Sequence, residues 1–323
     1  MAERYFTPEE LLALSRTPRE EVEACLRERP DAVTEIVASV TRSYRDQFGG
    51  SRDWIAAVLA FVHDRHGEEG LALATAATSR VIHALAAEGA LAVRGDGPAR
   101  AAEDIAGDTE AAVALVAGRA ATGDLDGALA AYDAFEDACR VVHDTYRDVL
   151  SALLSTVYGE WGPDELEALH RYCGEQTLLP WMLVDIAKPP EKRLVRWARM
   201  LKGHFSKLEI REDDEKFVLV QHPCGTCARQ VIGGRYAPPV GLAVVEEAHR
   251  VTWGRGTTPV YRTHVPVWHV QMARERLGVP WPVNRCPAGL GSGPCETLLY
   301  KDPYDTRANA FVPGPDQPNV ATP

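Results

Sequence analysis

Apolar residues recur every three or four positions along the longest helical pattern of this 323-residue chain. A helix turns once every 3.6 residues, so these side chains share one face, and a face this long must be buried against other helices. The pattern predicts a helical bundle, with the cysteine among these residues as a small core side chain. The residues are Leu129, Tyr132, Phe135, Cys139, Val142, Tyr146, Val149 and Leu153.

Two capping boxes mark helix starts near the N-terminus. Thr7–Glu10 and Thr17–Glu20 each supply a cap hydroxyl, a proline at the first helical position and a glutamate at the third. Further helices are predicted, separated by glycine-rich breaks such as Gly49-Gly50. They cover residues 31–47, 52–66, 68–90, 98–121, 124–158, 163–187 and 190–206.

The pattern changes at about residue 207. Lys207–Arg211 alternates apolar and polar side chains, and Lys216–Gln221 is an apolar run rich in strand-forming residues, which predicts a hairpin. Glycine and proline are dense beyond it, and the last residues form an extended tail. We expect short strands near 228–233, 258–264, 282–286 and 296–301, and one helix over about 266–278.

The predicted fold class is therefore mainly α. An N-terminal helical bundle over residues 1–206 is followed by a smaller, loop-rich α+β domain over residues 207–323, which is rich in cysteine and histidine.

Composition limits the setting and the partners. No apolar run approaches the ~18–20 residues that a membrane span needs. The first residues lack the basic and apolar regions of a secretory signal, so we expect a cytoplasmic protein without membrane contact. The formal net charge of −11 argues against a nucleic-acid partner, because phosphate binding needs a clustered basic face. No sequence feature sets an oligomeric state.

Four of the seven cysteines lie beyond residue 220, in glycine- or proline-rich turns: Cys224, Cys227, Cys286 and Cys295. The first two have the spacing of a metal knuckle, and in a reducing compartment thiols of this kind are metal ligands more often than disulfides. The second two are separated by eight residues, which leaves room for a histidine ligand. His264 ends a predicted strand and is the first candidate.

We therefore predict a bound transition metal, with zinc as the expected ion. Its ligands would be a subset of Cys224, Cys227, His264, Cys286 and Cys295. As second choices, His222 and His269 would be ligands or would hydrogen-bond to a ligand. The alternative for each histidine is an ordinary hydrogen-bonded structural residue.

A redox dithiol is the rival interpretation of Cys224 and Cys227. The sequence Cys-Gly-Thr-Cys would open a helix after the strand over 216–221, and a helix N-terminus lowers a thiol's pKa. However, Ile232-Gly233-Gly234 ends any such helix within about two turns, and no βαβ pattern follows.

Three functions remain open from the sequence. The first is a metal-dependent hydrolase or lyase that acts on a small-molecule substrate. The second is a non-enzymatic interaction protein, in which a closed zinc site stabilises the loop-rich domain and the helical half binds a partner. The third is a dithiol oxidoreductase. The catalytic candidates, which would orient an anionic substrate or move protons, are Arg229, Glu246, His249, Arg262 and His269.

The enzyme is the favoured function. The histidines exceed what a site of four thiolates would use, and Trp253, Trp268 and Trp281 lie near the candidate ligands, as in an aromatic-walled pocket. The alternative is that these tryptophans belong to the core.

Overall fold

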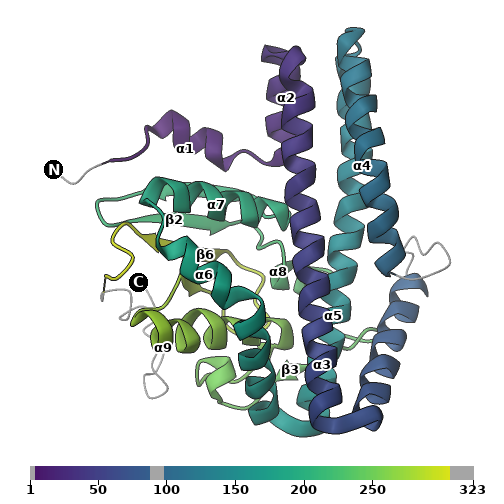
Figure 1. Cartoon of the computed structure of the whole chain (residues 1–323), viewed down its shortest axis with the longest axis vertical. Coiled ribbons are helices and arrows are strands. Elements are labelled where there is room, and N and C mark those ends of the chain that lie inside the picture. Colours follow the sequence, from purple (N-terminus) through teal and green to yellow (C-terminus); the bar gives the residue numbers. More distant parts are fainter. Residues whose placement is uncertain (1–3, 88–97, 306–323) are drawn as a thin grey trace.

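The computed structural model describes residues 4–87 and 98–305. Long helices occupy the N-terminal part, and a smaller part with strands and short helices follows (Figure 1). The predicted fold class, mainly α with an α+β C-terminal part, is confirmed.

Helices α1 (Pro8–Ser15) and α2 (Pro18–Glu28) begin at the two capping boxes. In each, the threonine hydroxyl accepts a hydrogen bond from the glutamate backbone, and the glutamate carboxylate accepts one in return. These starts depend on residues four positions apart at most, so the sequence alone predicts them. A short 3₁₀ helix, η1 (Pro30–Ala32), then leads into the bundle.

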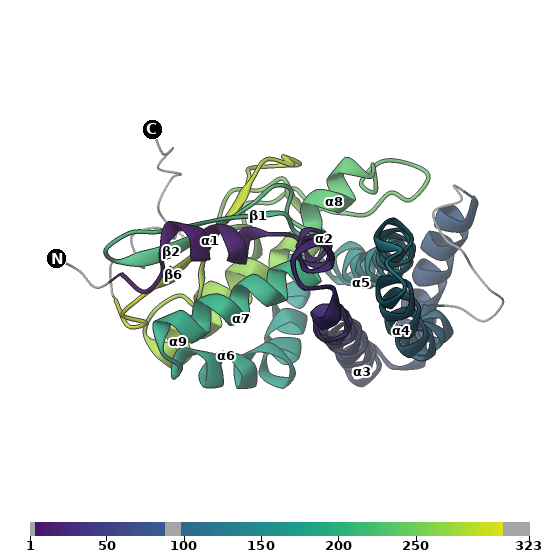
Figure 2. The ribbon, with the colours of Figure 1, turned by 90° about the horizontal axis from the view of Figure 1, so that it is seen from above.

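Three long helices form the bundle: α3 (Val33–Ala87), α4 (Pro98–Ala121) and α5 (Leu125–Gln176). Seen from above, they lie side by side (Figure 2). The predicted break at Gly49-Gly50 is wrong, because α3 continues through it. The non-helical positions are Gly67 (φ 64°) in α3 and Gly162 (φ 84°) in α5, where glycine tolerates a left-handed backbone.

The apolar stripe of α5 is buried, as its spacing predicts. Tyr132, Cys139 and Tyr146 pack in one core cluster with residues of α2, α3 and α4. The C-terminal part of the stripe, including Leu153, belongs to a second and larger cluster. That larger cluster contains Trp54 from the bundle and Phe217 from the sheet, so the two parts of the chain share a core.

Helices α6 (Leu178–Ile186) and α7 (Pro190–Gly203) connect the bundle to an antiparallel sheet. The sheet has the order β1-β2-β6-β5, with β1 (Leu208–Glu212) and β2 (Lys216–Gln221) as the predicted hairpin. Strands β5 (Val283–Arg285) and β6 (Cys295–Tyr300) complete it. Helix α7 packs against β1 and β6, and α6, α7 and α9 gather on one side of the sheet (Figure 2).

Two of the predicted strands are corrected. The strand predicted over residues 228–233 is instead helix α8 (Cys227–Ile232), which Gly233 caps. Of the strand predicted over 258–264, only Thr258–Pro259 forms a strand. This strand, β4, pairs with β3 (Val244–Val245). Pro259 lacks the N–H that would extend the pairing, and the chain turns into the 3₁₀ helix η3 (Val260–Thr263).

The remaining short elements surround the sheet. Helix η2 (Arg250–Thr252) precedes β4. The helix predicted over about 266–278 is present, as a π-helical segment η4 (Pro266–Met272) continued by α9 (Ala273–Leu277).

Helix α3 is more apolar than we expected from the sequence. The helix contains an 18-residue window of mean hydropathy 1.2, which is long and apolar enough to cross a membrane by length and composition. Core helices of soluble proteins pass the same test, so this is weak evidence for a span. The cytoplasmic location and the absence of membrane contact stay predictions.

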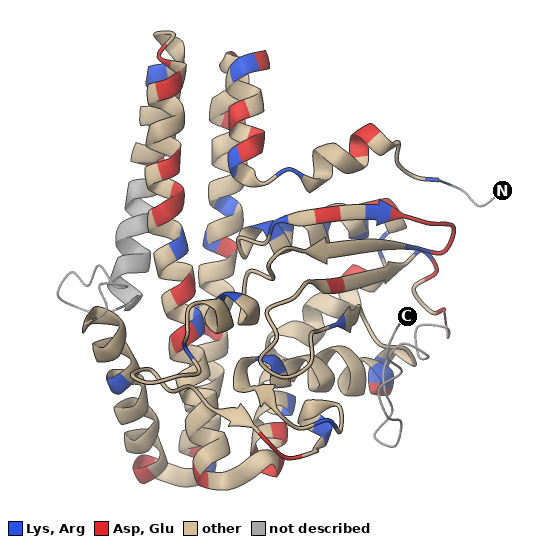
Figure 3. Cartoon of the chain, turned by 180° about the vertical axis from the view of Figure 1, so that it is seen from behind, with Lys and Arg blue, Asp and Glu red and all other residues tan. Residues whose placement is uncertain are grey.

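Acidic and basic residues are mixed along the long helices when the molecule is viewed from behind, without a continuous basic face in that view (Figure 3). The absence of a nucleic-acid partner stays a prediction.

Candidate metal centre

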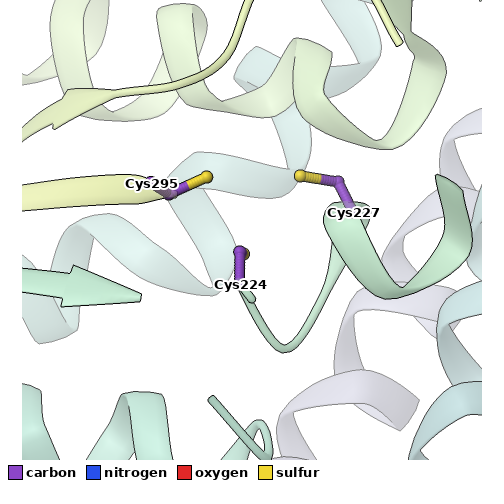
Figure 4. A group of neighbouring side chains, drawn as sticks. All are labelled: Cys224, Cys227 and Cys295. Atoms are coloured by element: carbon purple, nitrogen blue, oxygen red, sulfur yellow. The ribbon is translucent and has the colours of Figure 1, made fainter. Parts of the chain in front are cut away.

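Three buried thiols meet at one point. The Sγ atoms of Cys224, Cys227 and Cys295 all lie within 4.8 Å of one another, and each residue is less than one-tenth exposed. They come from different elements: a loop, the first residue of α8 and the first residue of β6. Their side chains converge on a common space (Figure 4).

Strand register brings the third cysteine to the other two. Gln221, the last residue of β2, pairs with Cys295 across the sheet, and the loop with Cys224 follows three residues later. The loop packs tightly on the end of α7. A side chain at Gly225 would place its Cβ 1.7 Å from the carbonyl oxygen of His204, and the Gly225 N–H donates to the Ser206 hydroxyl at 2.8 Å. Glycine is therefore required inside the Cys-Gly-Thr-Cys motif.

The geometry of the three sulfurs suits a single metal ion. Thiolates bound to one tetrahedral ion at ~2.3 Å lie about 3.8 Å from one another. The present separations, all within 4.8 Å, reach that arrangement with small side-chain movements.

All three cysteines line a cavity of about 340 Å³ between the bundle and the sheet. Its walls are mainly apolar, and four tryptophans contribute to them: Trp54, Trp181, Trp197 and Trp268. Of the tryptophans singled out from the sequence, only Trp268 is among these. Trp253 and Trp281 are buried in core clusters, so the aromatic wall comes largely from the helical half.

Three histidines also line this cavity: His204, His264 and His269. Burial lowers the pKa of His264 to about 3 and that of His269 to about 4, so both are neutral at neutral pH. With its Nδ1 donating to a backbone carbonyl, each ring keeps the Nε2 lone pair for a proton or a metal. The Nδ1 contacts are 2.5 Å from His264 to Tyr261 O and 3.0 Å from His269 to Trp281 O.

The three thiols differ in acidity. Hydrogen bonds from Cys224 and Cys295, together with the positive charge of Arg262, hold the pKa of Cys227 well below its ordinary value. The hydrogen bond to Cys227 raises the pKa of Cys224 to about 12, and contacts with the other cysteines raise the pKa of Cys295. Cys227 is therefore the most acidic of the three thiols.

Arg262 organises the chain around the cluster. It is 1% exposed, and its guanidinium donates to the carbonyls of Pro287 (2.5 Å), Gly289 (2.9 Å) and Gly291 (3.1 Å). These carbonyls belong to the segment that joins Cys286 to Cys295. One buried cation thus fixes the path of this segment and provides positive charge beside Cys227.

The structure brings three of the five predicted ligands together. Cys286 and His264 line the same cavity but lie outside the group of three sulfurs. Among the second-choice residues, His269 is in the cavity wall, whereas His222 is exposed and 3.8 Å from Glu209.

Of the five predicted catalytic candidates, two lie at the cluster or the cavity and three do not. Arg262 lies beside the cluster, and His269 lines the cavity. The other three are outside the cavity, held by local polar contacts. Arg229 pairs with Asp144, Glu246 accepts from the Thr257 hydroxyl at 2.8 Å, and His249 contacts Asp164 at 3.0 Å.

Sequence reasoning missed the polar residues that α5 contributes. His143, Arg147 and Ser151 are all buried, and they follow one another at four-residue spacing. Arg147 lines the cavity. Their spacing places them on one face of α5, but in the sequence this face looks like the solvent-exposed side of an amphipathic helix.

The fold and the site define a class: a mainly helical protein with a three-cysteine cluster in the wall of an aromatic cavity. No protein-family model, no curated protein and no solved structure matches this chain.

Proposed function

We propose that this protein is a metal-dependent enzyme, a hydrolase or lyase acting on a small molecule. Cys224, Cys227 and Cys295 would hold a transition-metal ion, with zinc as the expected ion, and the fourth coordination position would face the cavity. The observation that carries the proposal is the place of the three thiols in the wall of the cavity. A structural zinc site is instead closed by four protein ligands, whereas a catalytic site keeps one position open.

The metal would polarise a substrate carbonyl or lower the pKa of bound water. The chain supplies the remaining groups. His264 and His269 are neutral at neutral pH, so each Nε2 lone pair is free to accept a hydrogen bond from the substrate or from a metal-bound water. The tryptophan wall would hold an apolar substrate body beside the cluster.

Arg262 would balance the charge of the loaded site. A divalent ion with three thiolates has a net charge of −1, and the buried guanidinium beside Cys227 contributes +1. The site is then neutral overall, which favours metal retention in a buried setting.

Metal content of cysteine-to-serine variants tests the proposal. Protein purified without added metal is expected to contain about one equivalent by elemental analysis, and variants of Cys224, Cys227 or Cys295 are expected to lose it. Cys286→Ser is expected to keep the metal. Cys25→Ser is the matched control, because Cys25 is buried in the separate bundle core and donates to the Arg29 carbonyl at 3.3 Å.

The Cys286→Ser variant separates the enzyme from the structural alternative. If this variant also loses the metal, four thiolates close the site and the interaction-protein interpretation replaces the enzyme. Cobalt(II) substitution gives a second readout. Added azide should change the visible spectrum only where a coordination position is open, and an unchanged spectrum would count against catalysis.

A dithiol oxidoreductase is the second candidate, favoured by the lowered pKa of Cys227. Cys224 and Cys227 are 8% and 4% exposed, so only a small molecule entering the cavity would reach them. Mass spectrometry across glutathione redox buffers tests this function. It requires a reversible disulfide between these two cysteines at a physiological potential, in protein that binds no metal.

A further inference from the structure

A buried cation without a carboxylate partner lies in the cavity wall. Arg147, in the middle of α5, is 5% exposed and lines the cavity. Its guanidinium donates to the Tyr261 hydroxyl at 2.9 Å and to the Ser51 hydroxyl at 2.8 Å. Its Nε is buried and has no hydrogen-bond partner. Within the described part of the chain, no carboxylate forms an ion pair with it.

The nearby carboxylates are paired elsewhere. Asp144 pairs with Arg229, and Asp148 is 3.1 Å from Arg235. Hydroxyl groups satisfy two of the hydrogen-bonding directions of Arg147 but do not neutralise its charge. A buried charge left without a counter-ion is costly, so some other group is expected to supply the negative charge.

The metal centre does not account for this charge. The loaded three-thiolate site has a net charge of 2 − 3 = −1, and Arg262 beside Cys227 already matches it. In the described structure, Arg147 forms no hydrogen bond with Cys224, Cys227 or Cys295. Tyr261 lies between Arg147 and the cluster: its hydroxyl accepts a hydrogen bond from Arg147. Burial, which raises the pKa of Tyr261, and the charge of Arg147 influence that pKa more than Cys227 and Cys224 do.

The geometry points to Arg147 as the anchor for a carboxylate on the substrate. The rest of the cavity indicates the shape of that substrate. Trp54 and Trp268 form an apolar, aromatic wall, with ring centroids 4.4 Å apart and ring planes at 45° to each other. A volume of about 340 Å³ is near the small end for ligand pockets. The substrate class is therefore a small carboxylate with an apolar body. This inference rests on the proposed function in taking the cavity as the substrate site.

Benzoate and its neutral isostere benzamide are the probes. Titration calorimetry and the fluorescence of the cavity tryptophans report their binding to wild-type protein, both metal-loaded and metal-free. Benzoate is expected to bind about 10- to 100-fold more tightly than benzamide, as for a hydrogen-bonded charge pair. Because a metal could bind benzoate directly, the metal-free comparison is the one that isolates Arg147.

Substitution then assigns the preference to one side chain. Arg147→Met is expected to bring the benzoate-to-benzamide ratio close to one, and Arg147→Lys to keep part of it. Arg65→Met is the control, since Arg65 is exposed and pairs with Glu165 far from the cavity lining. If Arg147→Met does not fold, the wild-type ratio and the Lys variant decide the question.

The outcomes separate the two proposals. No preference for benzoate in metal-free wild type, no binding of either probe at about 10 mM, or a preference retained by Arg147→Met would overturn the carboxylate anchor. A clear preference in protein that never binds metal would support the anchor and reject the metal enzyme. Metal at one equivalent without a preference would reject the anchor alone.

Discussion

Arg262 should influence metal binding and loop stability by two different physical routes. Its charge favours the thiolate of Cys227, and its planar fork holds three carbonyls of the segment from Cys286 to Cys295. Arg262→Met removes both contributions, whereas Arg262→Lys keeps the charge but cannot span three carbonyls. The two variants therefore separate charge from hydrogen bonding.

The magnitude follows from the contacts. Hydrogen bonds from a charged donor contribute roughly 1.5–3 kcal/mol each. Water can replace some of them, because Pro287, Gly289 and Gly291 are only half-buried. We expect Arg262→Met to lower the free energy of unfolding of the metal-free protein by about 2–4 kcal/mol. Zinc affinity should fall about 10- to 100-fold, as for other groups that support a metal ligand.

Urea unfolding in the presence of a chelator measures the first effect, and competition with a chromophoric zinc chelator measures the second. Arg262→Lys should lose stability like Arg262→Met but retain more zinc affinity. Arg193→Met is the matched control, because Arg193 is equally buried and donates to two carbonyls outside the cavity. The reasoning fails if Arg193→Met weakens zinc binding as much as Arg262→Met, or if the Lys and Met variants bind zinc equally.

Two further predictions concern Gly225, in the loop of the cysteine motif, and His269, in the cavity wall. Gly225→Ala should lower both metal content and stability, because the added Cβ would lie only 1.7 Å from the His204 carbonyl oxygen. Elemental analysis and thermal melting measure the two effects. Wild-type values in both would contradict the prediction. Burial lowers the pKa of His269 to about 4, below the ~6.5 of an unfolded chain. Its neutral form therefore contributes stability that is complete above pH 6.5 and lost as the pH falls towards 4, by up to about 3 kcal/mol. Urea unfolding across this range should show a smaller loss for His269→Asn than for wild type.

Local signals in the sequence predicted local structure. The capping boxes at Thr7 and Thr17 and the hairpin of β1 and β2 involve residues close in the chain, and the structure has each of them. The break at Gly49-Gly50 failed for a tertiary reason. Packing of α3 on α5 keeps the helix intact through two glycines, so their intrinsic cost does not decide the outcome.

At the metal centre, too, local features could be predicted from the sequence and long-range ones could not. The spacing of Cys224 and Cys227 is visible in the sequence, but the choice between Cys286 and Cys295 depends on strand register. The pairing of Gln221 with Cys295 joins residues 74 positions apart, and spacing carries no information about it. Arg147 was missed because the cavity forms only when α5 meets the C-terminal elements.

Removal of the metal should loosen one part of the molecule and spare another. All three thiols and Arg262 belong to residues 222–295, whereas the bundle cluster around Tyr132 and Tyr146 contains none of them. Chelation should therefore speed amide hydrogen exchange in α8 and the segment from Cys286 to Cys295, with little change across residues 132–146 of α5. The reason is that the metal crosslinks a loop, a short helix and a strand, while the bundle retains its own apolar core. Exchange measured by mass spectrometry with and without chelator tests this, with Cys295→Ser as the metal-free reference. Equal acceleration in both regions would mean that the shared core transmits the loss through the whole chain, and the metal would then stabilise the entire fold.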